Sequence, residues 1–215
     1  MTRIKNASTA REHGTALVEF VVVFTILVPL LLGTIVIGLN LVRAIQVTEV
    51  CRDVGHMYAY GIDFSQNSNQ DLATKKLAQG LNMTDTGGNG VIILSTVTYI
   101  DDCRGGGYTT QNGCPNYGLM VFTNRLTIGN PSLHASRFGS PEYMDANGNI
   151  PQGRVGGQDG YLNDPADVAL PALSSTITLS QSGLYAYVSE MYTTSPDLDL
   201  WAYLNMTSPS AVSIF

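Results

Sequence analysis

A run of 23 residues without a charged side chain, from residue 20 to residue 42, constrains this chain more than any other feature. As an α-helix it would be about 34 Å long, enough to cross the roughly 30 Å hydrocarbon core of a bilayer. The run is apolar on all sides, which favours a membrane span over the core helix of a soluble domain. It is also too long for an ordinary secretory signal peptide, and no small-x-small cleavage site closes it.

The charges on either side of this run predict how it is oriented. Arg3, Lys5 and Arg11 precede it, within a polar leader formed by residues 1–14. Basic residues are sparser beyond its end, where Arg43 follows it. By the positive-inside rule, the leader lies in the cytoplasm and the rest of the chain lies outside the inner membrane.

Glu19 stands at the entrance of the run, with apolar residues on both sides. An unpaired carboxylate in such surroundings costs about 3 kcal/mol, so an intramembrane acid is a candidate functional group. If a peptidase cuts after Gly14, Thr15 gains a free α-amino group and Glu19 becomes the fifth residue of the mature chain. Glu19 of one subunit would then pair with the Thr15 amine of its neighbour. The alternative is that Glu19 extends to the lipid headgroups and the segment is a plain signal anchor.

The N-terminal residues resemble those of a known family. Residues 11–20 (REHGTALVEF), followed by PLLLG at residues 29–33, resemble the N-terminus of type IV pilins. The resemblance is closest to the TadE-like minor pseudopilins of tight-adherence (Tad) pili, and it covers residues 11–60. A weaker similarity at residues 186–192 (AYVSEMY) corresponds to a late strand of that family. Type IV pilins begin the mature chain with Phe; Thr15 fits the Tad-like branch and leaves its N-methylation open.

The resemblance implies a processing and assembly route. A membrane prepilin peptidase would remove the leader after Gly14, and the apolar helix would then join other pilin subunits. Major subunits of such pili are very short, so a chain of 215 residues implies a minor one. The implied organisation is a leader (1–14), a membrane or filament-core helix (15–42) and an extracytoplasmic head (43–215).

The predicted fold class is α+β and pilin-like, with the long N-terminal helix packed on an antiparallel sheet. The helix continues to about residue 60, because apolar residues recur at steps of three and four. This stripe consists of Val47, Val50, Cys51, Val54, Met57 and Tyr58. Gly61 is the predicted stop. Further predicted elements are a short helix at 71–81 and strands at 91–100, 119–128 and 184–192, with a fourth candidate strand at 176–179.

Two other segments carry specific expectations. Met120, Phe122, Leu126 and Ile128 are predicted to share one face of their strand. Residues 129–175 contain five of the nine prolines and seven of the 22 glycines, which predicts a long irregular insertion.

Cysteine and proline positions predict three local features. Cys103 and Cys114 flank a ten-residue glycine-rich loop, and a disulfide between them would brace it outside the membrane. Cys51, on the helical stripe, is predicted to be a buried apolar residue; an intermolecular bridge is the alternative. Pro29 removes a helical hydrogen bond and is a candidate hinge, although membrane helices also tolerate proline without any such role.

The sequence argues against several other functions. The formal net charge of −6 would repel nucleic acid. The three histidines lack ligand spacing and no nucleotide or hydrolase motif is present, so no enzyme, cofactor or metal site is predicted. Asp145–Asn149 resembles the start of a calcium loop, but Ile150 stands where a glycine is needed. A turn at Asn147–Gly148 explains that segment better.

The predicted function is therefore a minor pilin or pseudopilin that supports adhesion or pilus biogenesis. It would lie in the inner membrane before assembly and in the extracellular pilus afterwards. A major pilin and a type II secretion pseudopilin are alternatives within the same class. An alternative from another class is a single-span, membrane-anchored protein that binds a ligand through residues 129–175.

Overall fold

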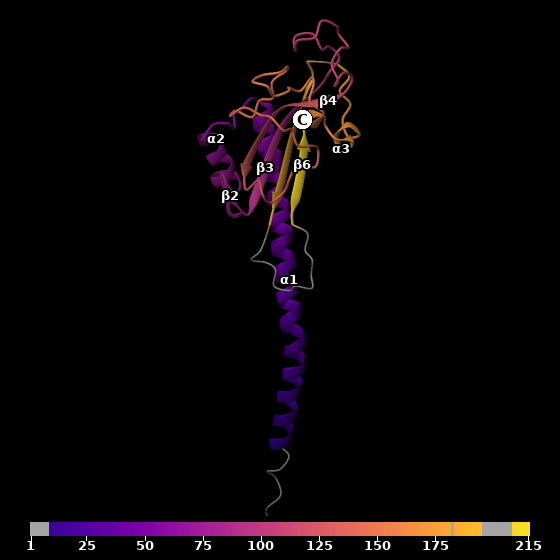
Figure 1. The fold of residues 1–215 in the computed structure, drawn as a ribbon. Helices are drawn as coiled ribbons and strands as arrows, with labels where there is room; N and C mark the ends of the chain where they lie inside the picture. The colour runs from indigo at the N-terminus through magenta and orange to yellow at the C-terminus, as the bar shows by residue number, and fades with distance from the viewer. Residues whose placement is uncertain (1–8, 182, 195–207) are drawn as a thin grey trace, which may run out of the picture. The chain divides into compact units, whose positions relative to one another are not determined.

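The computed structural model describes residues 9–181, 183–194 and 208–215, with side chains from Ala16 onward (Figure 1). The chain forms two compact units, Met1–Val42 and Arg43–Phe215. A long N-terminal helix is followed by antiparallel strands, which confirms the predicted α+β, pilin-like class.

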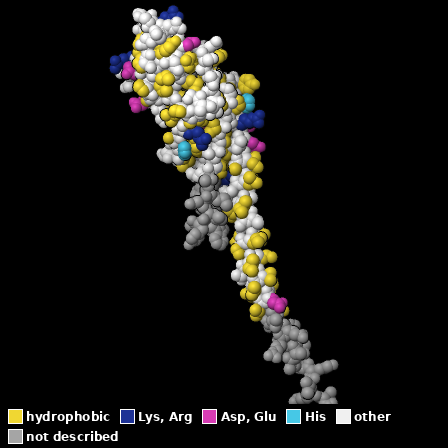
Figure 2. All heavy atoms as spheres, turned by 90° about the vertical axis from the view of Figure 1, so that its right-hand side faces the viewer, with side chains coloured by type: hydrophobic (Ala, Val, Ile, Leu, Met, Phe, Trp, Pro, Cys, Tyr) yellow, Lys and Arg dark blue, Asp and Glu magenta, His cyan; other side chains and the backbone are white. Residues whose placement is uncertain are grey.

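Helix α1, Thr9–Ala59, provides all the described structure of the first unit. In the described part of the chain it is the one helix that is long and apolar enough to cross a membrane. Its large side chains between Leu17 and Val42 are mostly exposed, as the hydrophobic atoms along the helix show in Figure 2. Pro29 lies inside the helix, and its role as a hinge stays a prediction.

Gly61 ends α1 as predicted. It adopts a φ of 86°, a left-handed conformation that a residue with a Cβ rarely adopts. The Ile62 amide donates to the Met57 carbonyl and the Gly61 amide donates to the Tyr58 carbonyl, each at 3.0 Å. These two bonds form a Schellman motif, which satisfies carbonyl groups that the helix end would leave unpaired.

The head contains a four-stranded antiparallel sheet in the order β4-β3-β5-β6. The strands are β3 (Gly90–Tyr99), β4 (Met120–Gly129), β5 (Tyr185–Thr193) and β6 (Ser210–Ile214). The second half of α1 packs on one face through the predicted stripe, of which Met57 alone is half-buried. Its main partners in the sheet are Ile92, Leu94, Ile128 and Met191. Strand β6 was not predicted, because only one of its five residues is buried and no alternating pattern marks it.

Strand β4 contains a bulge at Thr123. Thr96 of β3 pairs with Asn124, while the next residue, Val97, pairs with Phe122, so Thr123 has no pairing partner. One extra residue in a strand reverses the faces to which the side chains before and after it point. The bulge therefore divides β4 into two halves of opposite orientation.

This reversal corrects the sequence prediction for β4. Leu126 and Ile128 face α1, whereas Met120 and Phe122 lie in a second core on the opposite face. The prediction that all four share one face is wrong, because the alternation is broken at a residue with no sequence signature.

Residues 130–170 form the irregular insertion that was predicted, and they build the second core. Their regular structure is the 3-10 helix η2 (Pro165–Asp167), and the short helix α3 (Pro171–Ser174) follows. The buried side chains that this segment and α3 contribute to the second core are Phe138, Ile150, Ala169 and Leu173. The segment 176–179 is not a strand, which corrects that prediction; Thr176 and Ile177 instead donate to Leu173 at the end of α3.

The predicted helix at 71–81 begins earlier and changes type. Helix α2 (Asn67–Asp71) passes into the π-helix η1 (Leu72–Leu77), where the Ala78 amide donates to the Ala73 carbonyl at 2.9 Å. The wider turn buries Thr74, whose hydroxyl bonds to Asp85 at 2.6 Å. A two-stranded hairpin, β1 (Met83–Thr84) and β2 (Gly87–Gly88), follows.

Asp167 is a fully buried carboxylate in η2, and neither of its oxygens has a hydrogen-bond partner among the described residues. Burial is the main reason that its pKa rises from 3.8 to about 7, and the charges of Asp164 and Glu142 add to the rise. The ionised form is therefore a source of instability in the insertion.

We expect Asp167→Asn to stabilise the head by about 2 kcal/mol at pH 8, because it removes an unpaired buried charge. The pKa in the folded state is above that in the unfolded state, so the destabilisation is present above pH 7. It disappears as the pH falls from about 7 to about 4. Melting temperatures at pH 5 and pH 8 should therefore differ more for the wild type than for the variant. Asp159→Asn, at an exposed site, is the matched control. If the melting temperature of Asp167→Asn changed with pH as much as that of the wild type, Asp167 would not be the group responsible for the pH dependence.

Candidate assembly site

The predicted cleavage residues lie in the first turns of α1. The helix begins at Thr9, so Gly14 and Thr15 have helical backbone. The side chain of Thr15 lies outside the described part. Their roles in processing stay predictions.

Glu19 lies on the exposed surface of α1, with exposed apolar side chains on both sides of it in the sequence. The exposed fractions of its neighbours Val18 and Phe20 are 61% and 66%. Glu19 has no ion-pair partner within the described ranges. The carboxylate is therefore available to a group from outside the chain, which is the arrangement that the proposed intersubunit pair needs.

The uncharged polar side chains along the apolar part of α1 bond to their own helix. The Thr25 hydroxyl donates to the Val21 carbonyl at 2.7 Å, and the Thr34 hydroxyl donates to the Leu31 carbonyl at 2.8 Å. The Asn40 amide donates to Val36 at 3.1 Å. Because these groups are satisfied locally, the helix can lie in lipid or against other helices at little cost. Glu19 is the one ionisable side chain between residues 16 and 42.

The predicted disulfide joins Cys103 and Cys114, whose Cα atoms are 5.6 Å apart. Both cysteines are buried in a small core with Ile100, Val121 and Leu162. The disulfide therefore braces the glycine-rich loop and fixes it to the insertion.

Cys51 is fully buried, as predicted, and its thiol donates to the Ser189 carbonyl at 3.2 Å. Burial also raises the pKa of this thiol. A buried, protonated thiol is a poor nucleophile, which disfavours the alternative of an intermolecular bridge.

The segment 145–149 is a turn, as predicted. The Asp145 carboxylate accepts from the amides of Asn147 at 2.8 Å and Asn149 at 2.7 Å, and Gly148 has a φ of 77°. The hydrogen bond from the Asn149 side chain, together with these backbone bonds, holds the pKa of Asp145 below its usual value. Across the described ranges, no group of three or more His, Cys, Asp or Glu side chains is placed to hold a metal ion.

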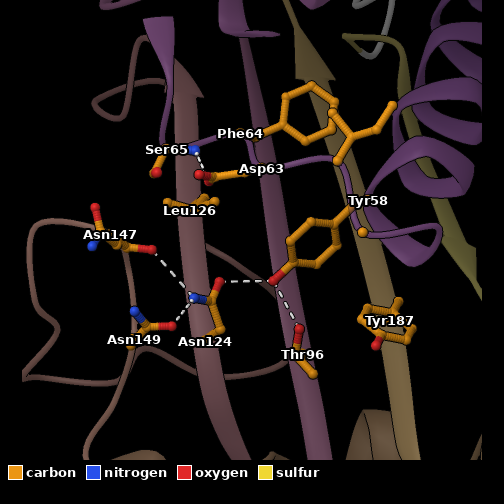
Figure 3. A pocket seen from close by; sticks show the side chains of 12 residues that line it. Tyr58, Asp63, Phe64, Ser65, Thr96, Asn124, Leu126, Asn147, Asn149 and Tyr187 are labelled. Atoms are coloured by element: carbon orange, nitrogen blue, oxygen red, sulfur yellow. Dashed lines mark hydrogen bonds between the residues drawn. The ribbon is translucent and has the colours of Figure 1, made fainter.

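A cleft of about 460 Å³ lies beside the C-terminal end of α1 (Figure 3). At its centre, the Tyr58 hydroxyl donates to Asn124 at 2.7 Å and bonds to Thr96 at 2.8 Å. The Asn124 amide in turn donates to the side chain of Asn149 at 2.8 Å and to the carbonyl of Asn147 at 3.2 Å. Sequence analysis missed this cleft, although Thr96 and Asn124 are polar residues inside apolar strands and could have signalled it.

A comparison with protein families connects the first part of the chain to a known group. The model of the family described as TadE-like protein matches residues 14–55. The match begins at the predicted cleavage site and includes Glu19, which confirms the resemblance stated from the sequence. Comparisons with curated proteins and with solved structures gave no match.

We expect the double variant Cys103→Ser, Cys114→Ser to lose about 3 kcal/mol of head stability, because the unfolded chain regains the entropy of an open loop. Chemical denaturation of the detergent-solubilised chain measures this loss. The reductant dithiothreitol should destabilise the wild type by the same amount and leave the double variant unchanged. Equal stability of reduced and oxidised wild type would contradict a structural role for this disulfide.

Proposed function

We propose that this chain is a minor pilin or pseudopilin of a Tad pilus, cut by a prepilin peptidase after Gly14 and assembled through α1. The TadE-like segment indicates a Tad pilus-associated protein. The observation that carries the finer proposal is the exposed apolar surface of α1, on which Glu19 is the one charged side chain. A structural subunit needs a surface of this kind in order to leave the membrane and join a filament.

The energetics of this surface give Glu19 a specific role. Lipid tails are as apolar as neighbouring helices, so exchanging one for the other yields no hydrophobic gain. A buried pair between Glu19 and the Thr15 amine of a neighbour would select one register. Leaving either charge buried without its partner costs about 3–5 kcal/mol. We infer that this pair fixes the axial position of each incoming subunit.

The proposed organisation is a cytoplasmic leader (1–14), a span in the inner membrane before assembly (15–42) and an extracytoplasmic head (43–215). The disulfide between Cys103 and Cys114 supports the location of the head, because disulfides persist outside the reducing cytoplasm. After assembly the head would be part of the extracellular pilus. The TadE-like pilus family is structural, and we propose that this chain likewise works without catalysis or a cofactor.

Abundance in sheared filaments separates this proposal from its alternatives in the same class. A trace amount fits a minor subunit, whereas dominance would make the chain the major pilin. Recovery with the type II secretion apparatus and not with pili would identify a secretion pseudopilin.

Processing can be tested by the intact mass of the chain extracted from membranes. We expect a mature chain that starts at Thr15 and lacks residues 1–14. Gly14→Val is the control, because a branched side chain beside the scissile bond should block the cut and retain the leader. Retention of Met1–Gly14 by the wild type would remove the pilin proposal and favour the membrane-anchored binding protein.

We expect Glu19→Val to be inserted and cut normally but to enter filaments at least about tenfold less well, because the neighbour's amine loses its partner. Glu19→Gln should show most of the same defect if charge rather than hydrogen bonding is decisive. Glu49→Val, at an exposed position on the same helix, is the matched control. Immunoblots of membranes measure insertion and cleavage, and immunoblots of sheared filaments measure incorporation. Normal incorporation of Glu19→Val would contradict the salt-bridge proposal.

A further inference from the structure

The cleft in Figure 3 lies where the sheet extends beyond the helix that covers it. Helix α1 ends at Ala59, and the hydroxyl of Tyr58 in its last turn reaches Thr96 of β3. Strand β3 continues from there to Tyr99. The cleft lies at this level, beside the end of α1. Farther along the same face, Ile100 and Val121 are covered by the small core around the disulfide.

The side chains on this face change from apolar to polar at the cleft. On β3, Ile92 and Leu94 under the helix are followed by Thr96. On β4, Ile128 and Leu126 are followed by Asn124. The change takes place on neighbouring strands at the same level, so the floor of the cleft is a continuous polar surface.

The bulge at Thr123 keeps this floor polar. In a regular strand, residue 122 would point to the same face as residue 124. The bulge turns the Phe122 ring to the opposite face, where it is buried in the second core. Asn124 therefore lines the cleft without an aromatic ring of β4 beside it. Bulges are common beside functional sites for this reason.

Hydroxyl and amide groups dominate the lining of the cleft, together with two tyrosine rings. Tyr58 and Tyr187 meet edge to face, with ring centroids 5.6 Å apart. No Lys or Arg is among the lining residues, and Asp63 is the one charged side chain there. Hydrogen bonds from Ser65 and Gln66 hold the pKa of Asp63 below its usual value, so it is ionised at neutral pH.

We propose that this cleft binds a neutral saccharide unit. A sugar ring carries hydroxyl groups that both donate and accept hydrogen bonds, which is what amide and hydroxyl side chains offer. Its C–H groups form an apolar surface that can lie against Tyr187 and Leu126. The absence of cationic side chains in the lining disfavours phosphates, and the negative charge of Asp63 disfavours acidic sugars. The volume is within the range of about 300–1,000 Å³ that is typical of small-molecule sites.

The central amide is already held in position for such a ligand. Asn124 is fixed by its bonds to Tyr58, Asn147 and Asn149, so little side-chain entropy remains to be lost on binding. The Asn147 side-chain amide is exposed and has no hydrogen-bond partner in the described part of the chain. It remains free to donate to a hydroxyl group at the rim.

This inference goes beyond the pilus role, because the cleft lies wholly within residues 43–215 and needs neither cleavage nor assembly. A pilus subunit with such a cleft would contact glycans on a surface. Its test is therefore separate from that of Glu19. A chain that binds no sugar can still assemble, and a chain that fails to assemble can still bind one.

The experiment titrates the full chain with glucose, galactose, mannose, N-acetylglucosamine, N-acetylneuraminate and glucuronate. A zwitterionic detergent is required, because a maltoside detergent would itself compete for the cleft. Saturation-transfer NMR detects binding and calorimetry measures it. A ligand of about twelve non-hydrogen atoms at ordinary efficiency has a Kd on the order of 1 mM. We expect at least one neutral sugar to bind in this range and both acidic sugars to bind more weakly.

Variants locate the binding site. We expect Asn124→Ala to weaken binding about tenfold, because it removes the remaining acceptor site of the Asn124 oxygen and the bonds that hold Asn147 and Asn149 in place. Asn147→Ala should weaken binding about threefold, because it removes the free side-chain donor at the rim. Asn112→Ala, at an exposed asparagine outside the cleft, should bind as the wild type does. Melting temperatures identify any loss that comes from unfolding, and Asn147→Ala should leave folding intact. The proposal is overturned if no neutral sugar binds, if an acidic sugar binds more tightly, or if both cleft variants bind as well as the wild type.

Discussion

The apolar surface of α1 cannot remain in water, and the rest of the structure depends on that constraint. Seventeen large apolar side chains between Leu17 and Val42 are exposed in the isolated chain. At about 1.5–3 kcal/mol each, covering them is worth about 25–50 kcal/mol, which exceeds the roughly 5–15 kcal/mol stability of a whole domain. This segment must therefore always be covered, by lipid or by other subunits. Since neither cover is more apolar than the other, hydrophobicity alone does not decide between them. In the proposed assembly, packing and the charge of Glu19 would decide.

Beyond residue 43, the same helix packs on the head instead of lying in a membrane or filament core. Charged side chains return there, and the apolar surface narrows to one stripe that the head's own sheet covers. The helix packs tightly at Gly55, where an added Cβ would lie 2.5 Å from the ring of Phe215 and 2.9 Å from Ser189. Phe215 also packs on His56, with ring centroids 4.2 Å apart. Phe215 thus packs against α1, the helix with which the head begins.

Much of this architecture is predictable from local patterns. The uncharged run, the helical stripe, the stop at Gly61 and the spacing of Cys103 and Cys114 each predict a feature that the structure contains. Strand β6 could not be found in this way, since only one of its five residues is buried and no alternating pattern marks it. The bulge at Thr123 was missed because the alternation in β4 reads as continuous until the register with β3 is known. The cleft depends on that bulge, and its one sequence signal is the pair of polar residues, Thr96 and Asn124, inside apolar strands.

The insertion shows how a long segment with little regular structure can still hold a site in place. Behind the sheet, the buried Glu190 accepts bonds from Ser136, the Arg137 amide and Tyr192. The buried Arg125 lies 4.3 Å above the ring of Phe122, and burial lowers its pKa to about 10.

Such groups are costly to bury unless they are bonded. The insertion supplies bonds to both, from Ser136 and Arg137 to Glu190 and from the Gly139 carbonyl to Arg125, and these bonds hold it against the sheet. The Asp145–Asn149 turn follows directly from this anchored segment and forms one wall of the cleft. A wall fixed by a buried polar network loses little freedom when a ligand arrives. The insertion is therefore better suited to selective recognition than a mobile loop of the same length would be.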